Sequence, residues 1–214
     1  SEHWVRYFQI NFPLIFFFCF LVSSCKRHSL SEESIKLIPY KGGETLYFRS
    51  DNDDIDSIEL DKPDRYFYDA GTPMSGFSGE KMEIYEFGGS YSNPNSDTLT
   101  NSSYSINDIL RLSASTNNKI YFDIHIQAKN ASFEPFSGIE IEDYKHLKTS
   151  TLSIPYGTFT DVIYFYPVID STRSDYYMKD NDNFITKVYW SKSKGLLRYD
   201  KKECYWQLVD IKHK

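Results

Sequence analysis

Apolar and polar positions alternate with period two along much of this chain, which is the pattern of half-buried β-strands. The longest example is the segment 119–129, where apolar residues occupy every second position from Ile120 to Ala128. The intervening positions, which begin with Tyr121 and Asp123, fall on the opposite face. Because successive side chains of a strand point to opposite faces of a sheet, this segment predicts one long strand.

Shorter segments with the same character are separated by clusters of Gly, Pro, Asp and Asn, at intervals typical of an antiparallel sheet. The carboxyl end predicts a three-stranded meander. A polar loop is expected over 170–183. The predicted strands are 44–50, 55–60, 65–69, 81–87, 138–144, 150–154 and 161–168, followed by the meander strands 184–191, 196–200 and 204–211.

The segment 105–112 fits two interpretations. Ser105 and Asp108 have the spacing of a capping box, and Ile106 and Ile109 have helical spacing, so the segment is either a helix or a further strand. The whole pattern predicts a mainly β fold, in which an antiparallel meander forms a sandwich or a partly open barrel. At most one or two short helices are expected.

An unbroken run of nine apolar residues extends from Leu14 to Val22. A helix needs ~20 apolar residues to cross a bilayer, whereas the apolar region of a secretory signal needs only about 7–15. Extending the run towards the amino terminus meets polar residues such as Arg6 and Gln9, which a membrane span would have to bury. The run therefore predicts a signal peptide, with a retained transmembrane helix as the alternative.

The apolar run ends in Val22, Ser23, Ser24 and Cys25, a sequence that resembles the lipobox of bacterial lipoproteins. In that family an aliphatic residue and two small residues precede the modified cysteine. The resemblance implies that the Cys25 thiol receives a diacylglyceryl group, and that cleavage before Cys25 exposes an amine that is also acylated. A general secretory signal followed by a coincidental cysteine is the alternative.

These features divide the chain into a lipoprotein signal peptide (1–24), a short polar tether (25–34) and a single β-rich domain (35–214). The chain has three cysteines. With Cys19 removed in the predicted signal and Cys25 acylated as the resemblance implies, Cys204 would have no partner for an intramolecular disulfide. Cys204 shares a strand face with Trp206 and Leu208. That position predicts a small core residue rather than a nucleophile.

Two carboxyl-terminal segments, 157–164 and 188–197, together with Trp206-Gln207-Leu208, are similar to a pattern in uncharacterised small lipoproteins of Bacteroidota-type bacteria. The resemblance implies a β-sheet domain, but no activity and no functional residue. In lipoproteins generally, an acidic residue just after the cysteine can cause retention in the inner membrane. Lys26 is not acidic, so the resemblance implies an outer-membrane anchor, with the domain facing either the periplasm or the exterior.

The composition of the chain excludes some classes of binding partner. The 24 Lys and Arg residues against 30 Asp and Glu give a net charge of -6, so no basic field exists to hold a nucleic acid. Apolar residues at 40% and charged residues at 25% exclude wholesale disorder. The 18 tyrosines and 16 phenylalanines favour half-buried sheet.

No motif predicts a cofactor or a metal site. The histidines are scattered, without the spacing of a zinc site on one element. The segment 76–80 lacks the closing glycine of a serine-hydrolase turn. The acidic segments 51–56 and 180–183 are rich in oxygen ligands, but an apolar residue stands where an EF-hand needs a ligand. The five histidines are His3, His28, His125, His146 and His213.

Glu140 and Glu142 lie two residues apart, which is compatible with an acid/base pair but better explained by a charged outer strand face. We therefore predict a non-catalytic envelope protein, held in the membrane by its lipid anchor, whose sheet surface binds another protein or a glycan. The surplus of tyrosine supports this prediction. The alternative is a carrier of an apolar ligand or lipid, with Phe122, Ile124 and Ile126 lining a cavity in a curved sheet.

Overall fold

A computed structural model of the chain describes residues 26–69, 79–92, 104–124, 126–128, 131–133, 138–167 and 185–213. Across these ranges the fold is mainly β with two short helices, as the sequence predicts. The helices are α2 (Glu32–Ile35) and α3 (Ile141–His146). The strands are β1 (Lys26–His28), β2 (Glu44–Ser50), β3 (Ile55–Leu60), β4 (Asp64–Asp69), β5 (Glu80–Ser92), β6 (Tyr104–Ala114), β7 (Ile120–Ile124), β8 (Ile126–Ala128), β9 (Ala131–Phe133), β10 (Ile139–Glu140), β11 (Ser150–Ile154), β12 (Gly157–Phe165), β13 (Lys187–Ser191), β14 (Gly195–Asp200) and β15 (Tyr205–His213).

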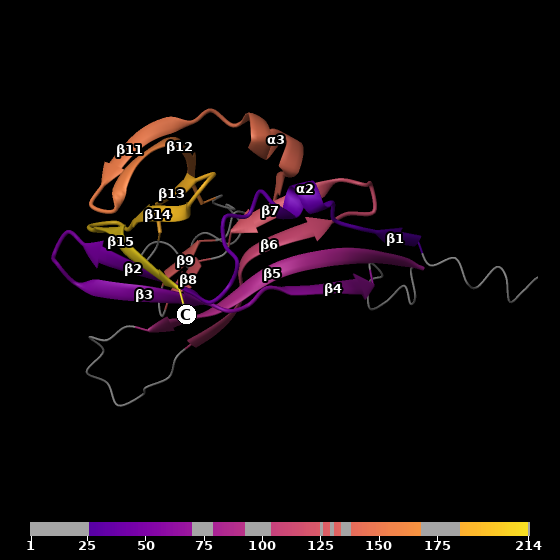
Figure 1. Cartoon of the computed structure of the whole chain (residues 1–214), viewed down its shortest axis with the longest axis horizontal. Coiled ribbons are helices and arrows are strands. Elements are labelled where there is room, and N and C mark those ends of the chain that lie inside the picture. Colours follow the sequence, from indigo (N-terminus) through magenta and orange to yellow (C-terminus); the bar gives the residue numbers. More distant parts are fainter. Residues whose placement is uncertain are drawn as a thin grey trace, which may run out of the picture.

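One continuous 13-stranded sheet contains most of these strands, in the order β10-β7-β6-β5-β3-β2-β15-β14-β13-β12-β11, with β1 and β4 both added to β5. Neighbouring strands are antiparallel, and the exception among the described pairs is β1, which runs parallel to β5. The sheet curls around itself into a half-barrel (Figure 1). Strands β8 and β9 form a separate pair.

Helix α3 connects the two edge strands of the large sheet, because it follows β10 and precedes β11 in the chain. Its Ile141 and Tyr144 are buried. The Tyr144 ring lies 4.8 Å from that of Phe122, and its hydroxyl accepts a hydrogen bond from the indole nitrogen of Trp190 at 3.1 Å. Burial raises the pKa of this hydroxyl to about 12. The helix therefore packs across the interval between the two sheet edges.

The core inside the curled sheet is rich in aromatic side chains. Tyr40 is buried at its centre, with its ring 5.9 Å from Trp190 and 6.5 Å from Phe87. Its hydroxyl accepts a hydrogen bond from the backbone nitrogen of Leu196 at 2.7 Å, so the polar atom is satisfied. Burial raises the pKa of Tyr40 well above its ordinary value. The other largest fully buried side chains include Phe48, Phe122 and Tyr199.

Most predicted strands are present. The segments 44–50, 55–60 and 150–154 form strands with those bounds, and the carboxyl-terminal meander forms β13, β14 and β15. The strands predicted at 65–69, 81–87 and 161–168 correspond to β4, the longer β5 and the shifted β12. The polar loop predicted at 170–183 lies outside the described residues.

One open choice is settled and two expectations need correction. The segment 105–112, which fits either a helix or a strand, lies in strand β6; its residues 105–106 pair with β5, and its residues 110–112 pair with both β5 and β7. The single strand 119–129 is instead divided into β7 and β8, and β8 pairs with β9. The strand 138–144 is wrong after Glu140, since Ile141 and Tyr144, three residues apart, both reach the core from a helix.

The segment 26–34, expected as a polar tether, is part of the folded domain. Strand β1 pairs with β5, and His28, Leu30 and Ser34 are buried. Leu30 belongs to the core, and Ser31 caps helix α2 by accepting a hydrogen bond from the Ser34 nitrogen at 3.1 Å. The fold therefore includes residues 26–34, which precede the start expected near Ile35. The predicted signal peptide and Cys25 lie outside the described residues, in which no helix is long and apolar enough to cross a membrane.

Candidate functional site

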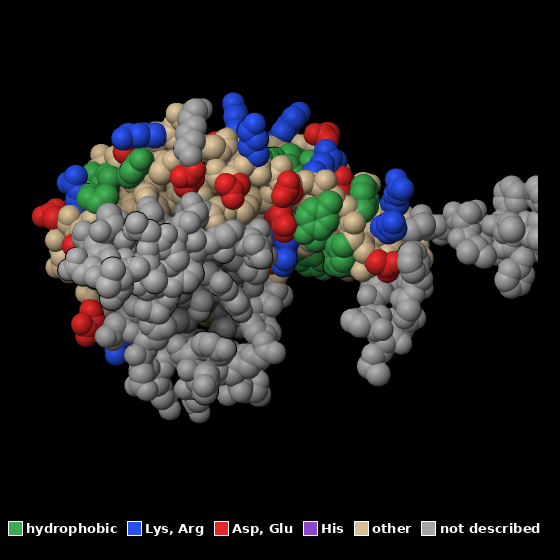
Figure 2. Space-filling view, turned by 90° about the horizontal axis from the view of Figure 1, so that it is seen from below, with side chains coloured by type: hydrophobic (Ala, Val, Ile, Leu, Met, Phe, Trp, Pro, Cys, Tyr) green, Lys and Arg blue, Asp and Glu red, His purple; other side chains and the backbone are tan. Residues whose placement is uncertain are grey.

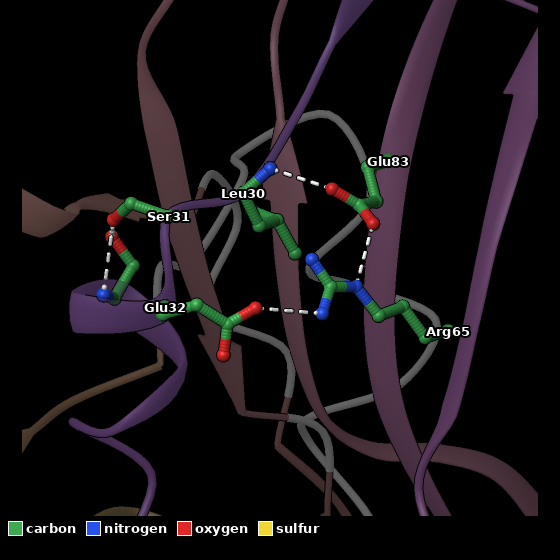
Figure 3. Close-up of polar contacts among 6 residues, drawn as sticks. Leu30, Ser31, Glu32, Arg65 and Glu83 are labelled. Atoms are coloured by element: carbon green, nitrogen blue, oxygen red, sulfur yellow. Dashed lines mark hydrogen bonds and ion pairs between the residues drawn. The ribbon is translucent and has the colours of Figure 1, made fainter.

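A buried carboxylate joins the amino-terminal segment to strands β4 and β5. Glu83 of β5 accepts a hydrogen bond from the Leu30 backbone nitrogen at 2.8 Å and another from the Nε atom of Arg65 at 2.6 Å (Figure 3). Arg65 also donates to Glu32 at 2.9 Å. The hydrogen bonds to Glu83 and Glu32 raise the pKa of the Arg65 guanidinium. We call Leu30, Glu32, Arg65 and Glu83 the N-terminal clamp.

Strand β4 carries three consecutive aromatic residues that are exposed on both of its faces. Tyr66, Phe67 and Tyr68 are 41%, 38% and 40% exposed, and we call them the aromatic ribbon. The Arg27 guanidinium lies over the Phe67 ring at 5.4 Å, and Tyr66 donates a hydrogen bond to Glu86 at 3.0 Å. At the end of the molecule that contains β1, Figure 2 shows hydrophobic side chains among basic and acidic ones.

A second group of aromatic and charged side chains lies on one face of strands β12 to β15. The register places Tyr164 opposite Tyr189 and Tyr189 opposite Arg198, while Lys187 lies opposite Asp200. Adjacent strands therefore present these side chains to the same side of the sheet. We call Tyr164, Tyr166, Lys187, Tyr189, Arg198 and Tyr205 the tyrosine platform.

Two cations lie against the rings of this platform. The Lys187 ammonium lies 4.1 Å from the ring centre of Tyr164, 4.4 Å from that of Tyr189 and 5.6 Å from that of Tyr166. The Arg198 guanidinium lies 4.0 Å from the Tyr205 ring centre and 5.0 Å from that of Tyr189. Each ring face attracts a cation through its quadrupole, so the platform is held together by cation–π contacts.

Asp200 completes the platform by accepting two hydrogen bonds, from the Tyr189 hydroxyl at 2.7 Å and from Arg198 at 2.6 Å. Partial burial works to lower the pKa of Lys187, but its contacts with Tyr189 and Tyr166 outweigh burial and raise that pKa. The ammonium is therefore charged at neutral pH. Flat rings, fixed cations and a carboxylate together suit the recognition of a partner with apolar faces and polar groups.

Several sequence-predicted candidates fall on separate elements. Glu140 pairs with Lys119 at 2.5 Å, whereas Glu142 pairs with Lys145 at 2.6 Å within α3, so the two carboxylates do not form a pair on one strand face. Cys204, which was predicted to be a core residue of the last strand, is instead half-buried and lies just before β15. Cys25, the predicted lipidation site, lies outside the described residues.

The metal-ligand candidates that the structure describes lie on separate elements. Among the described residues, no group of His, Cys, Asp and Glu side chains has the arrangement of a metal site. The acidic turn 51–54 is organised by Ser50, whose hydroxyl accepts hydrogen bonds from the backbone nitrogens of Asn52 and Asp54. The Nδ1 atom of His28 lies 3.1 Å from the Oδ1 atom of Asn118. The acidic segment 180–183 lies outside the described residues.

Neither the clamp nor the platform was among the sequence-predicted sites. The alternation in 161–168 and 196–200 places Tyr164 and Arg198 on strand faces, so this part of the platform could be predicted from the sequence. The register that brings them beside Tyr189 depends on the pairing of three strands. The clamp joins residues more than fifty positions apart, such as Leu30 and Glu83, which no local spacing predicts.

Comparison of the chain with protein-family models, curated proteins and solved structures gives no match. The class of the protein therefore follows from its geometry, as a mainly β domain built from one curled antiparallel sheet.

Proposed function

We propose that the protein is a non-catalytic lipoprotein of the bacterial cell envelope, anchored in the outer membrane through Cys25, that binds another envelope protein or a glycan. The observation that carries the binding role is the tyrosine platform. It brings four tyrosines, two cations and Asp200 to one sheet face, and Tyr166 is 59% exposed. Tyrosine and arginine are enriched at binding interfaces because they combine apolar area with polar groups.

The anchor rests on the sequence. The nine-residue apolar run ends at Val22-Ser23-Ser24-Cys25, and the next residue, Lys26, is already in strand β1. Cleavage before Cys25 would therefore leave the acylated residue directly next to β1 in the chain.

The alternative carrier role receives less support. Phe122, Ile124 and Ile126 are buried, but the Phe122 ring lies 5.6 Å from Trp190 as well as against Tyr144. The row predicted to line a cavity therefore contacts other core side chains.

Lipidation is tested by feeding radiolabelled palmitate to cells that produce the full chain or the Cys25→Ala variant. We expect label in the wild-type protein and none in the variant, because the thiol is the acyl acceptor. Equal labelling of both proteins would refute the anchor and the localisation.

Binding is tested by retention of envelope components on the immobilised domain 26–214, which contains every described contact. We expect Tyr166→Ser to lose the retained protein or glycan, because it removes the most exposed ring of the platform. Tyr68→Ser is the matched control, since it removes an exposed tyrosine from β4, which does not pair with the strands of the platform. Equal retention by both variants, or no retention by the wild type, would contradict the proposed role of the platform.

A further inference from the structure

We propose that the β1 end of the domain lies in the headgroup region of the membrane that holds the lipid anchor, with the aromatic ribbon as the contacting surface. This inference rests on the proposed acylation of Cys25. The occupant of the ribbon is thus a phospholipid surface, and the anchor fixes an orientation of the domain in addition to its location.

The first step is the absence of slack between the predicted anchor and the sheet. The Lys26 backbone nitrogen donates a hydrogen bond to the Gly79 carbonyl oxygen at 2.8 Å, and Lys26 lies in register with Glu80. Consecutive Cα atoms are ~3.8 Å apart, so the Cα atom of the acylated residue lies within about 4 Å of strand β1. A lipid on Cys25 therefore brings the sheet itself to the membrane surface.

The second step is the distance between the ribbon and this point. Lys26 is level with Glu80, Tyr68 with Met82 and Tyr66 with Ile84. At ~3.3 Å per residue along β5, Tyr68 is about 7 Å and Tyr66 about 13 Å from the level of Lys26. These distances are measured along β5 in the direction that leads away from Cys25. The ribbon contacts the headgroups when β4 lies along the membrane surface rather than perpendicular to it, and this is the orientation that we propose.

The third step is the chemistry of this end of the domain. Exposed Tyr and Phe side chains next to Lys and Arg are typical of the membrane interface, where amphipathic rings sit among headgroups. Arg27 lies over Phe67, and Lys26 is 3.9 Å from Glu80. Because acidic side chains accompany the basic ones, the contact we propose depends mainly on apolar and aromatic burial rather than on net charge.

The fourth step is the rigidity of the connection. The N-terminal clamp ties the segment that follows β1 to both β4 and β5, through Glu83, Arg65 and Leu30 (Figure 3). The segment 26–30, which follows the predicted lipidation site, is therefore joined to the strand that carries the ribbon. The strands that carry the tyrosine platform lie towards the other end of the half-barrel from β1 (Figure 1).

The experiment uses the full chain, produced in bacteria and purified from membranes, with a tryptophan placed as a depth probe. Tyr68→Trp reports on the ribbon, and Ile55→Trp is the matched control, because Ile55 is similarly exposed at 39% but follows the β2–β3 turn at the far end (Figure 1). Each protein is reconstituted into phosphatidylethanolamine and phosphatidylglycerol vesicles whose acyl chains carry bromine near the headgroup. Quenching is measured relative to the wild-type protein, which supplies the signal of the native tryptophans.

We expect a loss of fluorescence for Tyr68→Trp and none for Ile55→Trp. The intact mass of each purified protein is measured first, because it tests the lipid anchor on Cys25 separately from the orientation of the domain. A lipidated protein in which Tyr68→Trp is not quenched overturns the orientation and leaves the anchor standing, and this is also the outcome if the ribbon pairs with a second copy of the chain. Equal quenching of both probes overturns the orientation as well. A protein without lipid on Cys25 overturns both the anchor and the orientation.

Discussion

At the residue scale, a contact with one buried tyrosine explains why position 195 requires glycine. The φ of Gly195, +86°, lies in the left-handed region, and a Cβ atom at this position would lie 2.2 Å from the Tyr40 hydroxyl oxygen. The same hydroxyl accepts the hydrogen bond from Leu196 in the core. Glycine is therefore required both by the backbone angle and by the close approach of a buried side chain.

We predict that Gly195→Ala lowers the free energy of unfolding by about 2–4 kcal/mol, since left-handed strain and overpacking act together. Gly43→Ala is the matched control, because Gly43 has a φ of +85° but no atom within 4 Å of the added Cβ. That variant should lose only about 1–2 kcal/mol, from backbone strain alone. Urea unfolding measures the free energy of unfolding of both variants. An equal decrease in the two variants would contradict the role of the Tyr40 contact.

At the element scale, the N-terminal clamp explains why a polar segment is folded. The segment 26–34 has few apolar residues, so its composition predicts a tether. In the structure Leu30 enters the core, and Glu83 receives hydrogen bonds from both Leu30 and Arg65. A buried carboxylate with two donors is stable only while both are in place. The clamp therefore couples the order of this segment to strands β4 and β5.

We predict that Glu83→Ala releases the amino-terminal segment while the core remains folded. The Leu30 nitrogen would lose its buried acceptor, which costs about 1–3 kcal/mol. Amide hydrogen exchange should become faster over 28–35, with little change in β13 and β14.

Glu86→Ala is the control for the clamp variant, because Glu86 lies on the same strand and accepts a hydrogen bond from Tyr66 in an exposed contact. It should leave exchange over 28–35 unchanged. If Glu83→Ala also leaves this exchange unchanged, the clamp does not hold the segment.

At the scale of the whole molecule, strand β15 joins the two halves of the sheet. It pairs with β14 on one side and with β2 on the other, so residues 206–213 meet residues 44–50. The carboxyl terminus therefore completes a sheet that the amino-terminal strands begin. Leu208, which lies opposite Phe48, is fully buried at this junction.

We predict that Leu208→Ala lowers the free energy of unfolding by about 2–5 kcal/mol through loss of buried contact and a residual cavity. Ile211→Ala, on the same strand but only partly buried, should cost less. Unfolding should remain a single transition when followed by tryptophan fluorescence and by far-ultraviolet circular dichroism. Two separate transitions would mean that the two halves of the sheet are stable independently.

The element types were largely predictable because alternation is a local signal. Period two over 44–50 and 150–154 predicted strands with the observed bounds, and Gly, Pro and Asp clusters marked the turns. Prediction failed where tertiary contacts decide between two local options. The strand predicted at 138–144 gives way to a helix where Tyr144 reaches Trp190. The spacing in 105–112 left helix and strand both open, and pairing with β5, together with pairing of residues 110–112 with β7, makes it a strand.

The sequence by itself determined the mainly β class, the carboxyl-terminal meander and the apolar run before Cys25, because each follows from residues close together in the chain. Only the tertiary structure decided that residues 26–34 belong to the sheet, that α3 connects its two edges and that Tyr164, Tyr189 and Arg198 share a face. These features depend on register and on burial between distant segments. Such contacts form once the whole sheet curls around its core, and local spacing does not specify them.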